Sequence, residues 1–311
     1  MKDKKQQFIF KFMERRRVAY LFSGLLILVS VGSLFIRGLN LGIDFTGGTL
    51  VEVGFSETVE LNSVRSSLAG SEFKDATVQY FGTSRDVLIR VAPKLDKNSA
   101  TVSSELVALL QSAGKQAELR RQEFVGPQVG EELTEDGGLA MIAALAMIML
   151  YVAVRFQMRF SVGAIVALLH DVIITIGFFS LTQMNFDLTV LAAILAVIGY
   201  SLNDTIVVFD RIRENFHVLR KAQPLEILNI SINQTLSRTI ITGMTTILVL
   251  VSLFVVGGET LHAFSAALIV GIVIGTYSSI YIASPVILAL GVSKKDLMTV
   301  EKEGADLPDR P

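Results

Sequence analysis

Residues 160–182 read FSVGAIVALLHDVIITIGFFSLT, a run in which the ionisable side chains are His170 and Asp171. A helix needs about 20 predominantly apolar residues to cross the hydrocarbon core of a bilayer. Because a backbone in lipid must satisfy its own hydrogen bonds, a run of this length and composition predicts a transmembrane helix. This stretch therefore decides the fold class.

Five further stretches share this apolar character and are at or near the required length. They are residues 18–36, 138–154, 188–209, 239–256 and 262–290. Hydrophobic residues make up 51% of the 311-residue chain and charged residues 18%, below the ~25% typical of soluble domains. The sequence predicts a multi-pass α-helical membrane protein with a six-helix transmembrane bundle, and it disfavours a soluble enzyme.

Composition also narrows the chemistry. The 28 basic and 29 acidic residues nearly cancel, so no overall field favours a nucleic-acid partner. The chain has no cysteine and three histidines, which argues against a disulfide framework, a thiolate nucleophile or a metal centre. We therefore expect no cofactor, no metal site and no catalytic residue.

Lysine and arginine are distributed unevenly along the predicted loops. Residues 1–17 contain seven of them, whereas loops 183–187 and 257–261 contain none. Basic residues favour cytoplasmic loops, so we expect both chain ends in the cytoplasm. The expected plan is a basic cytoplasmic tail (1–17), a first helix (18–36), an outer domain (37–137), five helices (138–290) with a cytoplasmic loop (210–238), and a cytoplasmic tail (291–311).

The outer segment alternates between strand and helix patterns. Strands are expected at 49–55, 76–81, 86–91 and 117–124, and helices at 60–68 and 100–114. Alternating apolar and polar residues mark the strands, and apolar residues at helical spacing mark the helices. The order β-α-β-β-α-β predicts an α+β ferredoxin-like domain between the first and second spans.

Ionisable residues inside the spans are candidates for a functional site, because a charge in mid-bilayer costs free energy. At the helical rise per residue, Asp171 lies about 17 Å from the cytoplasmic edge of its span. Asp204 lies about 8 Å from the same face, and Arg238 lies closer to it. Asp204 and Arg238 are therefore expected to meet across the fourth and fifth spans.

Simpler interpretations stay open for each of these residues. Asp204 and Arg238 can form a structural ion pair that holds the bundle together. Arg238 alone can extend its side chain to the lipid headgroups. Asp171, next to His170, is either a structural hydrogen-bonded group or part of a proton relay.

Two glycine-containing motifs flank the outer segment: GIDFTGGT at 42–49 and VGP at 125–127. Glycine allows positive φ angles and close backbone approach. The first motif lacks the lysine of a phosphate-binding loop, so we interpret both as shaped turns or hinges between membrane and domain. The candidate hinge or structural residues are Gly42, Asp44, Gly47, Gly48, Gly126 and Pro127.

Three further stretches complete a pattern that includes both glycine motifs. They are LHDVIITIGFFSL (169–181), LAVIGYSLNDTIVVFDRIREN (195–215) and NQTLSRTIITGMTTILVLVSLFVVGG (233–258). In this order they make the chain resemble the SecF proteins, bacterial protein-export membrane proteins of the SecD/SecF family and the resistance-nodulation-division superfamily. The resemblance covers essentially the whole chain.

The resemblance implies a multi-pass protein of the bacterial inner membrane with its large domain in the periplasm. It implies partnership with SecD and the SecYEG translocon, with YajC as a further candidate partner, and an exported unfolded polypeptide as cargo. It also implies that the proton-motive force drives pulling or release of that polypeptide on the outer side. In the family, the aspartate of SLND and the arginine of SRT belong to the proton relay; here these are Asp204 and Arg238.

Three other functions compete with this one. A half-size, proton-driven exporter of small molecules would share the superfamily plan, although the chain has no internal repeat. An intramembrane aspartyl protease would use Asp171 and Asp204 as a pair sharing one proton, but their expected depths differ by about 9 Å. A passive scaffold would use the charges for packing alone. We expect a transport subunit and not an enzyme.

Overall fold

The computed structural model of the chain describes residues 10–94, 97–219 and 221–292. Most of the expected tails, 1–17 and 291–311, therefore lies outside the described residues. Within the described residues, six helices are long and apolar enough to cross a membrane, which confirms the predicted number of spans. Their ranges are Phe12–Arg37, Pro127–Arg155, Met158–Thr182, Leu188–Val218, Pro224–Val256 and Leu261–Ala289.

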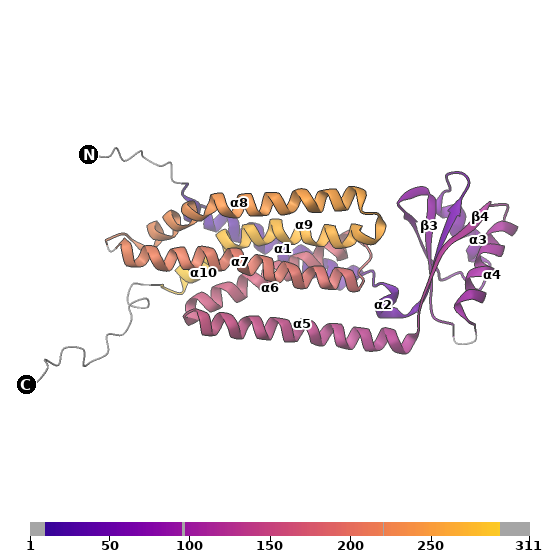
Figure 1. Ribbon diagram of the computed structural model, residues 1–311, viewed down its shortest axis with the longest axis horizontal. Coiled ribbons are helices and arrows are strands. Elements are labelled where there is room, and N and C mark those ends of the chain that lie inside the picture. The colour runs from indigo at the N-terminus through magenta and orange to yellow at the C-terminus, as the bar shows by residue number, and fades with distance from the viewer. Residues whose placement is uncertain (1–9, 95–96, 220, 293–311) are drawn as a thin grey trace, which may run out of the picture.

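The spans form an elongated bundle with a sheet domain at one end, and the described ends of the chain lie at the opposite end (Figure 1). The helices are α1 (Arg16–Arg37), α5 (Pro127–Arg155), α6 (Met158–Thr182), α7 (Leu188–Val218), α8 (Pro224–Val256) and α9 (Glu259–Ser278). The last span continues through a π-helix, Ser279–Ala283, into α10 (Ser284–Ala289). Helices α6, α7 and α9 are central and at least half buried, whereas α1, α5 and α8 are mostly exposed.

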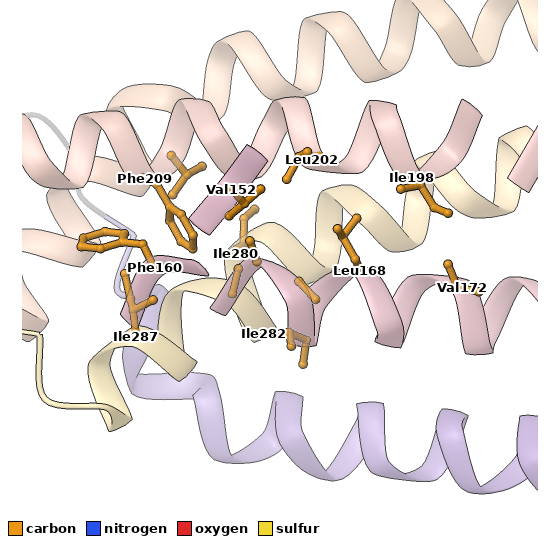
Figure 2. Close-up of a cluster of buried hydrophobic side chains, with 14 of the residues drawn as sticks. Val152, Phe160, Leu168, Val172, Ile198, Leu202, Phe209, Ile280, Ile282 and Ile287 are labelled. Carbon is orange, nitrogen blue, oxygen red and sulfur yellow. The ribbon is translucent and has the colours of Figure 1, made fainter. Parts of the chain in front are cut away.

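Apolar side chains from the central helices pack against one another in the interior of the bundle (Figure 2). The rings of Phe160 on α6 and Phe209 on α7 meet edge to face at 5.1 Å. Ile287 from α10 lies in the same cluster. This contact ties the last span to the two helices that carry the interior carboxyl groups.

Three helix boundaries lie far from the expected ones. Helix α5 begins at Pro127 and not at residue 138, because its first turns are polar and escape a hydropathy criterion while remaining helical. Most of the expected loop 210–238 is helix, since α7 continues to Val218 and α8 begins at Pro224. The side chain of Asn215 on α7 donates to Ser231 on α8 at 2.8 Å, so these helix ends support each other.

The sheet domain, Gly48–Val125, has the predicted order of strands and helices. Its strands are β1 (Gly48–Phe55), β2 (Thr77–Phe81), β3 (Thr83–Val91) and β4 (Ala117–Val125), and its helices are α3 (Leu61–Ala69) and α4 (Ser99–Ser112). The spatial order is β2-β3-β1-β4 with antiparallel neighbours. This is the split β-α-β arrangement, so the expectation of an α+β ferredoxin-like domain between the first two spans is confirmed.

One face of the sheet packs on α3 and α4. In register, Val51 of β1 lies beside Ile89 of β3, and both are buried against Val64 and Leu106 from the two helices. Apolar side chains dominate this core, and among the described residues of the domain no charged side chain is buried. The opposite face of the sheet is directed at the bundle.

Candidate functional site

Glycines allow the three central helices to approach closely. A Cβ atom added at Gly271 on α9 would lie 2.2 Å from a methyl group of Val197 on α7, and one at Gly275 would lie 2.9 Å from Cβ of Ser201. Small residues at such crossings let short polar side chains bond directly from helix to helix. The polar groups of the bundle interior depend on this proximity.

Asp171 on α6 is the centre of a hydrogen-bond cluster. Its Oδ2 accepts from the hydroxyls of Ser201 on α7 at 2.5 Å and Ser278 on α9 at 2.8 Å. Its Oδ1 lies 2.9 Å from Nδ1 of His170. Both oxygens of this buried carboxyl group are therefore engaged, and the three central helices are joined at one point.

The cluster extends towards α1 through aromatic contacts. The His170 ring stacks on Tyr277 at 6.1 Å between centroids. The Tyr277 hydroxyl donates to the carbonyl oxygen of Ala19 at 2.9 Å and lies 3.0 Å from Oγ of Ser23. His170 Nε2 is buried without a hydrogen-bond partner among the described residues.

Asp204 lies one turn beyond Ser201 on α7 and has a different environment. Its side chain is buried, and its Oδ2 has no hydrogen-bond partner among the described residues. Its neighbour Thr205 lies 2.9 Å from Ser279 at the start of the π-helix, hydroxyl to hydroxyl. A buried acceptor without a donor is costly, so the carboxyl group of Asp204, unlike that of Asp171, is open to a change of partner.

Arg238 on α8 is exposed at the surface of the bundle. The sequence predicts that Arg238 and Asp204 meet across α7 and α8, but no ion pair within 4.0 Å joins these two described residues. Asp171 on α6 thus contacts α7 at Ser201, one turn before Asp204. Arg238 lies at the edge of the site that contains these two carboxyl groups.

Sequence reasoning missed two parts of the site. Ser278 donates to Asp171, and the π-helix that follows it contacts Thr205, the residue after Asp204. Single-turn π-helices are rare and often occur at functional sites. The pair Ser278-Ser279 in an otherwise apolar span is the sequence signal that could have indicated both.

The glycine motifs form a close-packed joint between the bundle and the sheet domain. Gly47 and Gly48 have φ angles of 66° and 121°, and a Cβ at Gly48 would lie 2.5 Å from the carbonyl oxygen of Val91. Between Gly42 and Gly47 the chain forms α2 (Ile43–Thr46). The Oδ2 atom of Asp44 accepts from the backbone N–H of Leu188 at 3.1 Å, which ties this joint to the first turn of α7.

The second motif packs against the first. Gly126 precedes α5 in an extended conformation, and Pro127 is the first residue of that helix. A Cβ added at Gly47 would lie 3.0 Å from Cα of Pro127, and one at Gly42 would lie 3.0 Å from Cβ of Asp187. These residues fix where the sheet domain leaves the membrane.

Comparison with known proteins gives a consistent result. The family described as protein export membrane protein SecD/SecF, C-terminal, matches residues 105–293, and the SecD/SecF GG motif matches residues 32–59. The SecF subunits of the protein translocases of Vibrio alginolyticus and Pseudomonas aeruginosa are each 51% identical over 303 residues and 96% of this chain, and 96% and 97% of their own lengths are covered.

Solved structures agree with the sequence comparison. The crystal structure of SecDF from Thermus thermophilus, a translocon-associated membrane protein, matches with a TM-score of 0.83 and 40% identity over 91% of this chain. SecDF in a super-membrane-facing form matches with a TM-score of 0.68 and 38% identity over the same share. The present chain spans 38% and 39% of the lengths of those two chains.

Six spans, an α+β domain inserted after the first span and carboxyl groups inside the central helices define a polytopic membrane protein of the SecDF type. The chain belongs to the SecD/SecF family of protein-export membrane proteins, as a SecF subunit of a protein translocase. It is a transport subunit and not an enzyme.

Proposed function

We propose that the chain couples proton movement to polypeptide export together with SecD, next to the SecYEG translocon. The observation that carries this proposal is the buried Asp204 carboxyl group, whose Oδ2 has no hydrogen-bond partner among the described residues although it lies in the polar interior of the bundle. A carboxyl group with this freedom can be charged in one arrangement of its neighbours and protonated in another. The SecDF chains, of which this chain matches little more than a third, support association with SecD.

The two protonation states of Asp204 call for different positions of α7 and α8. A charged carboxylate attracts the guanidinium of Arg238 and favours closure of the gap between the helices, whereas a protonated carboxyl group releases it. Asp171 serves as the fixed neighbour, because its oxygens already accept from two other helices and from His170.

The same proposal places the sheet domain in the periplasm and both chain ends in the cytoplasm, in the bacterial inner membrane. Its support is the distribution of basic residues together with the location of the described chain ends opposite the sheet domain (Figure 1). Reporter fusions after Gly82 and Gln223 should report the outer and the cytoplasmic side, respectively. The reverse pattern would refute this orientation.

The rival functions fit the geometry less well. An aspartyl protease needs two carboxyl groups free to share a proton and activate water, but both oxygens of Asp171 are engaged by neighbouring side chains. A small-molecule exporter is the alternative, and the solved relative described as translocon-associated argues against it. The proposal also includes SecYEG, YajC and a polypeptide cargo, because the resemblance to the SecD/SecF family implies these partners.

The decisive experiment measures protein export with and without a proton-motive force. Asp204→Asn should express normally, associate with SecD and lose the force-dependent part of export. Arg238→Lys should retain part of the activity, because lysine keeps the charge but lacks the planar fork. Glu214→Gln, an exposed carboxylate on the same helix paired with Arg211, is the matched control and should export normally. Wild-type export by well-expressed Asp204→Asn refutes the relay.

A further inference from the structure

The face of the sheet that is not covered by α3 and α4 lies over the end of the bundle. Between them is a cavity of about 310 Å³. On the sheet side it is lined by Leu50, Glu52, Leu88, Arg90, Arg121 and Glu123, among others. On the bundle side it is lined by residues of the α2 joint, of the α6–α7 connection and of the start of α9.

Arg90 on β3 crosses from the sheet to the bundle beside this cavity. Its guanidinium donates through one nitrogen to Oδ1 of Asn40 at 3.2 Å and to the carbonyl oxygen of Leu41. Through the other terminal nitrogen it donates to Oδ1 of Asn185. One side chain of the sheet domain therefore holds two separate segments of the membrane part: the linker after α1 and the connection between α6 and α7.

The acceptors of Arg90 are tied to the first turn of α7. Asn185 donates to Oδ2 of Asp187 at 3.4 Å, and Oδ1 of Asp187 accepts from the backbone N–H of Val190 at 3.0 Å as the N-cap of the helix. The backbone N–H of Phe186 donates to the carbonyl oxygen of Asn40 at 2.8 Å. A shift of the first turn of α7 thus displaces both chain segments that hold Arg90.

The electrostatic state of Arg90 makes this contact sensitive to small displacements. The side chain is partly buried, and its Nε is buried without a hydrogen-bond partner among the described residues. Burial lowers the pKa of the Arg90 guanidinium from its ordinary value, while the nearby Asp187 and Asp44 carboxylates act in the opposite direction. A desolvated cation held by neutral oxygens has much to lose when those oxygens move.

Helix α7 runs without a break from this contact to Asp204. The distance from Leu188 to Asp204 along the helix is about 24 Å at the rise of an α-helix. A continuous helix carries a displacement at Asp204 to its first turn, where the acceptors of Arg90 are attached. The contact is therefore mechanically connected to the candidate relay.

We propose that Arg90 is the positioning residue that couples α7 to the sheet domain, so that the position of α7 sets the orientation of this domain over the bundle. This role rests on the proposed function of Asp204, which supplies the movement of α7. The guanidinium suits it because its planar fork can hold acceptors from two segments at once, which an ammonium group cannot do with the same geometry.

The test measures the orientation of the sheet domain directly. The chain has no native cysteine, so spin labels can be placed at Ser66 on α3 and Val256 at the end of α8, both exposed. Pulsed electron spin resonance on the full chain with SecD in nanodiscs then gives the distance distribution between the two parts. The wild-type chain should give a narrow distribution.

Arg90→Ala should lose this narrow peak, and Arg90→Lys should restore it in part. Asn185→Ala removes a single acceptor and should broaden the distribution less, which keeps the test valid if Arg90→Ala accumulates poorly. Arg121→Ala is the matched control, because Arg121 lines the same cavity but pairs with Glu123 on its own strand. An unchanged distribution in both Arg90→Ala and Asn185→Ala overturns the proposal.

Export separates coupling from a merely structural role. Arg90→Ala should lose the force-dependent part of export while proton uptake dependent on Asp204 persists, and Arg90→Lys should recover part of both orientation and export. Normal export in a chain whose distance distribution has broadened overturns the coupling role. If instead Asp204→Asn exports normally, the proposed function fails, and with it the source of the movement, while the effect of Arg90→Ala on orientation is still measured independently.

Discussion

The sheet domain and the bundle have opposite interiors. The core of the sheet domain consists of apolar side chains such as Val51 and Leu106, and its ion pairs lie at the surface. The bundle exposes apolar side chains along α1, α5 and α8 and buries His170, Asp171 and Asp204 between its central helices. The sheet domain therefore keeps its charged groups at the surface, whereas the bundle keeps charged groups in its interior.

The difference teaches which residues specify each region. In water, burial of apolar surface drives a core together. In lipid, the surroundings are as apolar as the helix surfaces, so close packing of small residues and interhelical hydrogen bonds select the contacts. Removing a carboxylate should therefore matter little on the sheet domain and strongly in the bundle, and it should matter differently at Asp171 and Asp204.

The largest effect on folding is expected for Asp171→Leu. The change leaves the hydroxyl of Ser201 and Nδ1 of His170 without their shared acceptor, at about 1–3 kcal/mol for each buried group left unpaired. The hydroxyl of Ser278 also loses Asp171 but keeps the carbonyl oxygen of Gly275 as an acceptor at 3.0 Å. The amount of monodisperse protein after detergent extraction should fall sharply. If Asp171→Leu remains as stable as wild type, hydrogen bonding does not hold the bundle interior.

A glycine pair gives the next largest contrast. Gly271→Ala places a methyl group 2.2 Å from a Val197 methyl group, whereas Gly70→Ala in the sheet domain meets no atom within 4 Å. Overpacking of this kind costs about 1–3 kcal/mol. Thermal unfolding of the purified chain should show a lower midpoint for Gly271→Ala and no loss for Gly70→Ala. Equal midpoints would contradict the close helix crossing.

The sheet domain was the easier region to predict from sequence, because its alternation follows the pleat. The predicted strand 49–55 is observed as Gly48–Phe55 and the predicted strand 86–91 as Thr83–Val91, which is longer because Thr83, Ser84 and Arg85 are polar residues on an exposed strand end. The start of α5 was missed since its first turns carry acidic residues, although a glycine followed by proline is compatible with a helix start.

The candidate site was predicted in part. The free-energy cost of charges in lipid was enough to select Asp171 and Asp204. The sequence could not show which of the two carboxyl groups is fully hydrogen-bonded, because the donors Ser201 and Ser278 come from two other helices. Arg90 was missed for the same reason, since its acceptors are more than 45 residues away along the chain.

Asp204→Leu sharpens the comparison inside the bundle. Its Oδ2 accepts no hydrogen bond from the described residues, so an apolar side chain of similar size leaves no donor unpaired there. Replacing such a group is close to neutral or stabilising. The unfolding midpoint should stay within error of wild type or rise, while force-dependent export is lost. A collapse of folded protein comparable to that of Asp171→Leu would show that Asp204 is structural.

The smallest effect is expected at Glu72 on the sheet domain. Hydrogen bonds from Lys94 and Lys97 lower the pKa of this exposed carboxyl group from 4.5 to about 2. A group whose pKa is lower in the folded state stabilises that state above its unfolded pKa. The contribution is therefore present above pH 4.5 and is lost as the pH falls towards 2.

Glu72→Gln should consequently lower the stability of residues 40–127, expressed alone, near neutral pH and converge with wild type near pH 2. Urea unfolding across this range measures the difference, which salt should reduce because exposed charges are screened. Glu57→Gln is the control, since Glu57 is exposed and forms no ion pair with any described residue. A Glu72→Gln effect that persists at acid pH and in high salt cannot come from this ion pair. The loss of stability would then have to arise from packing. In that case the surface charges of the sheet domain would not be dispensable, and they would no longer contrast with the buried charges of the bundle.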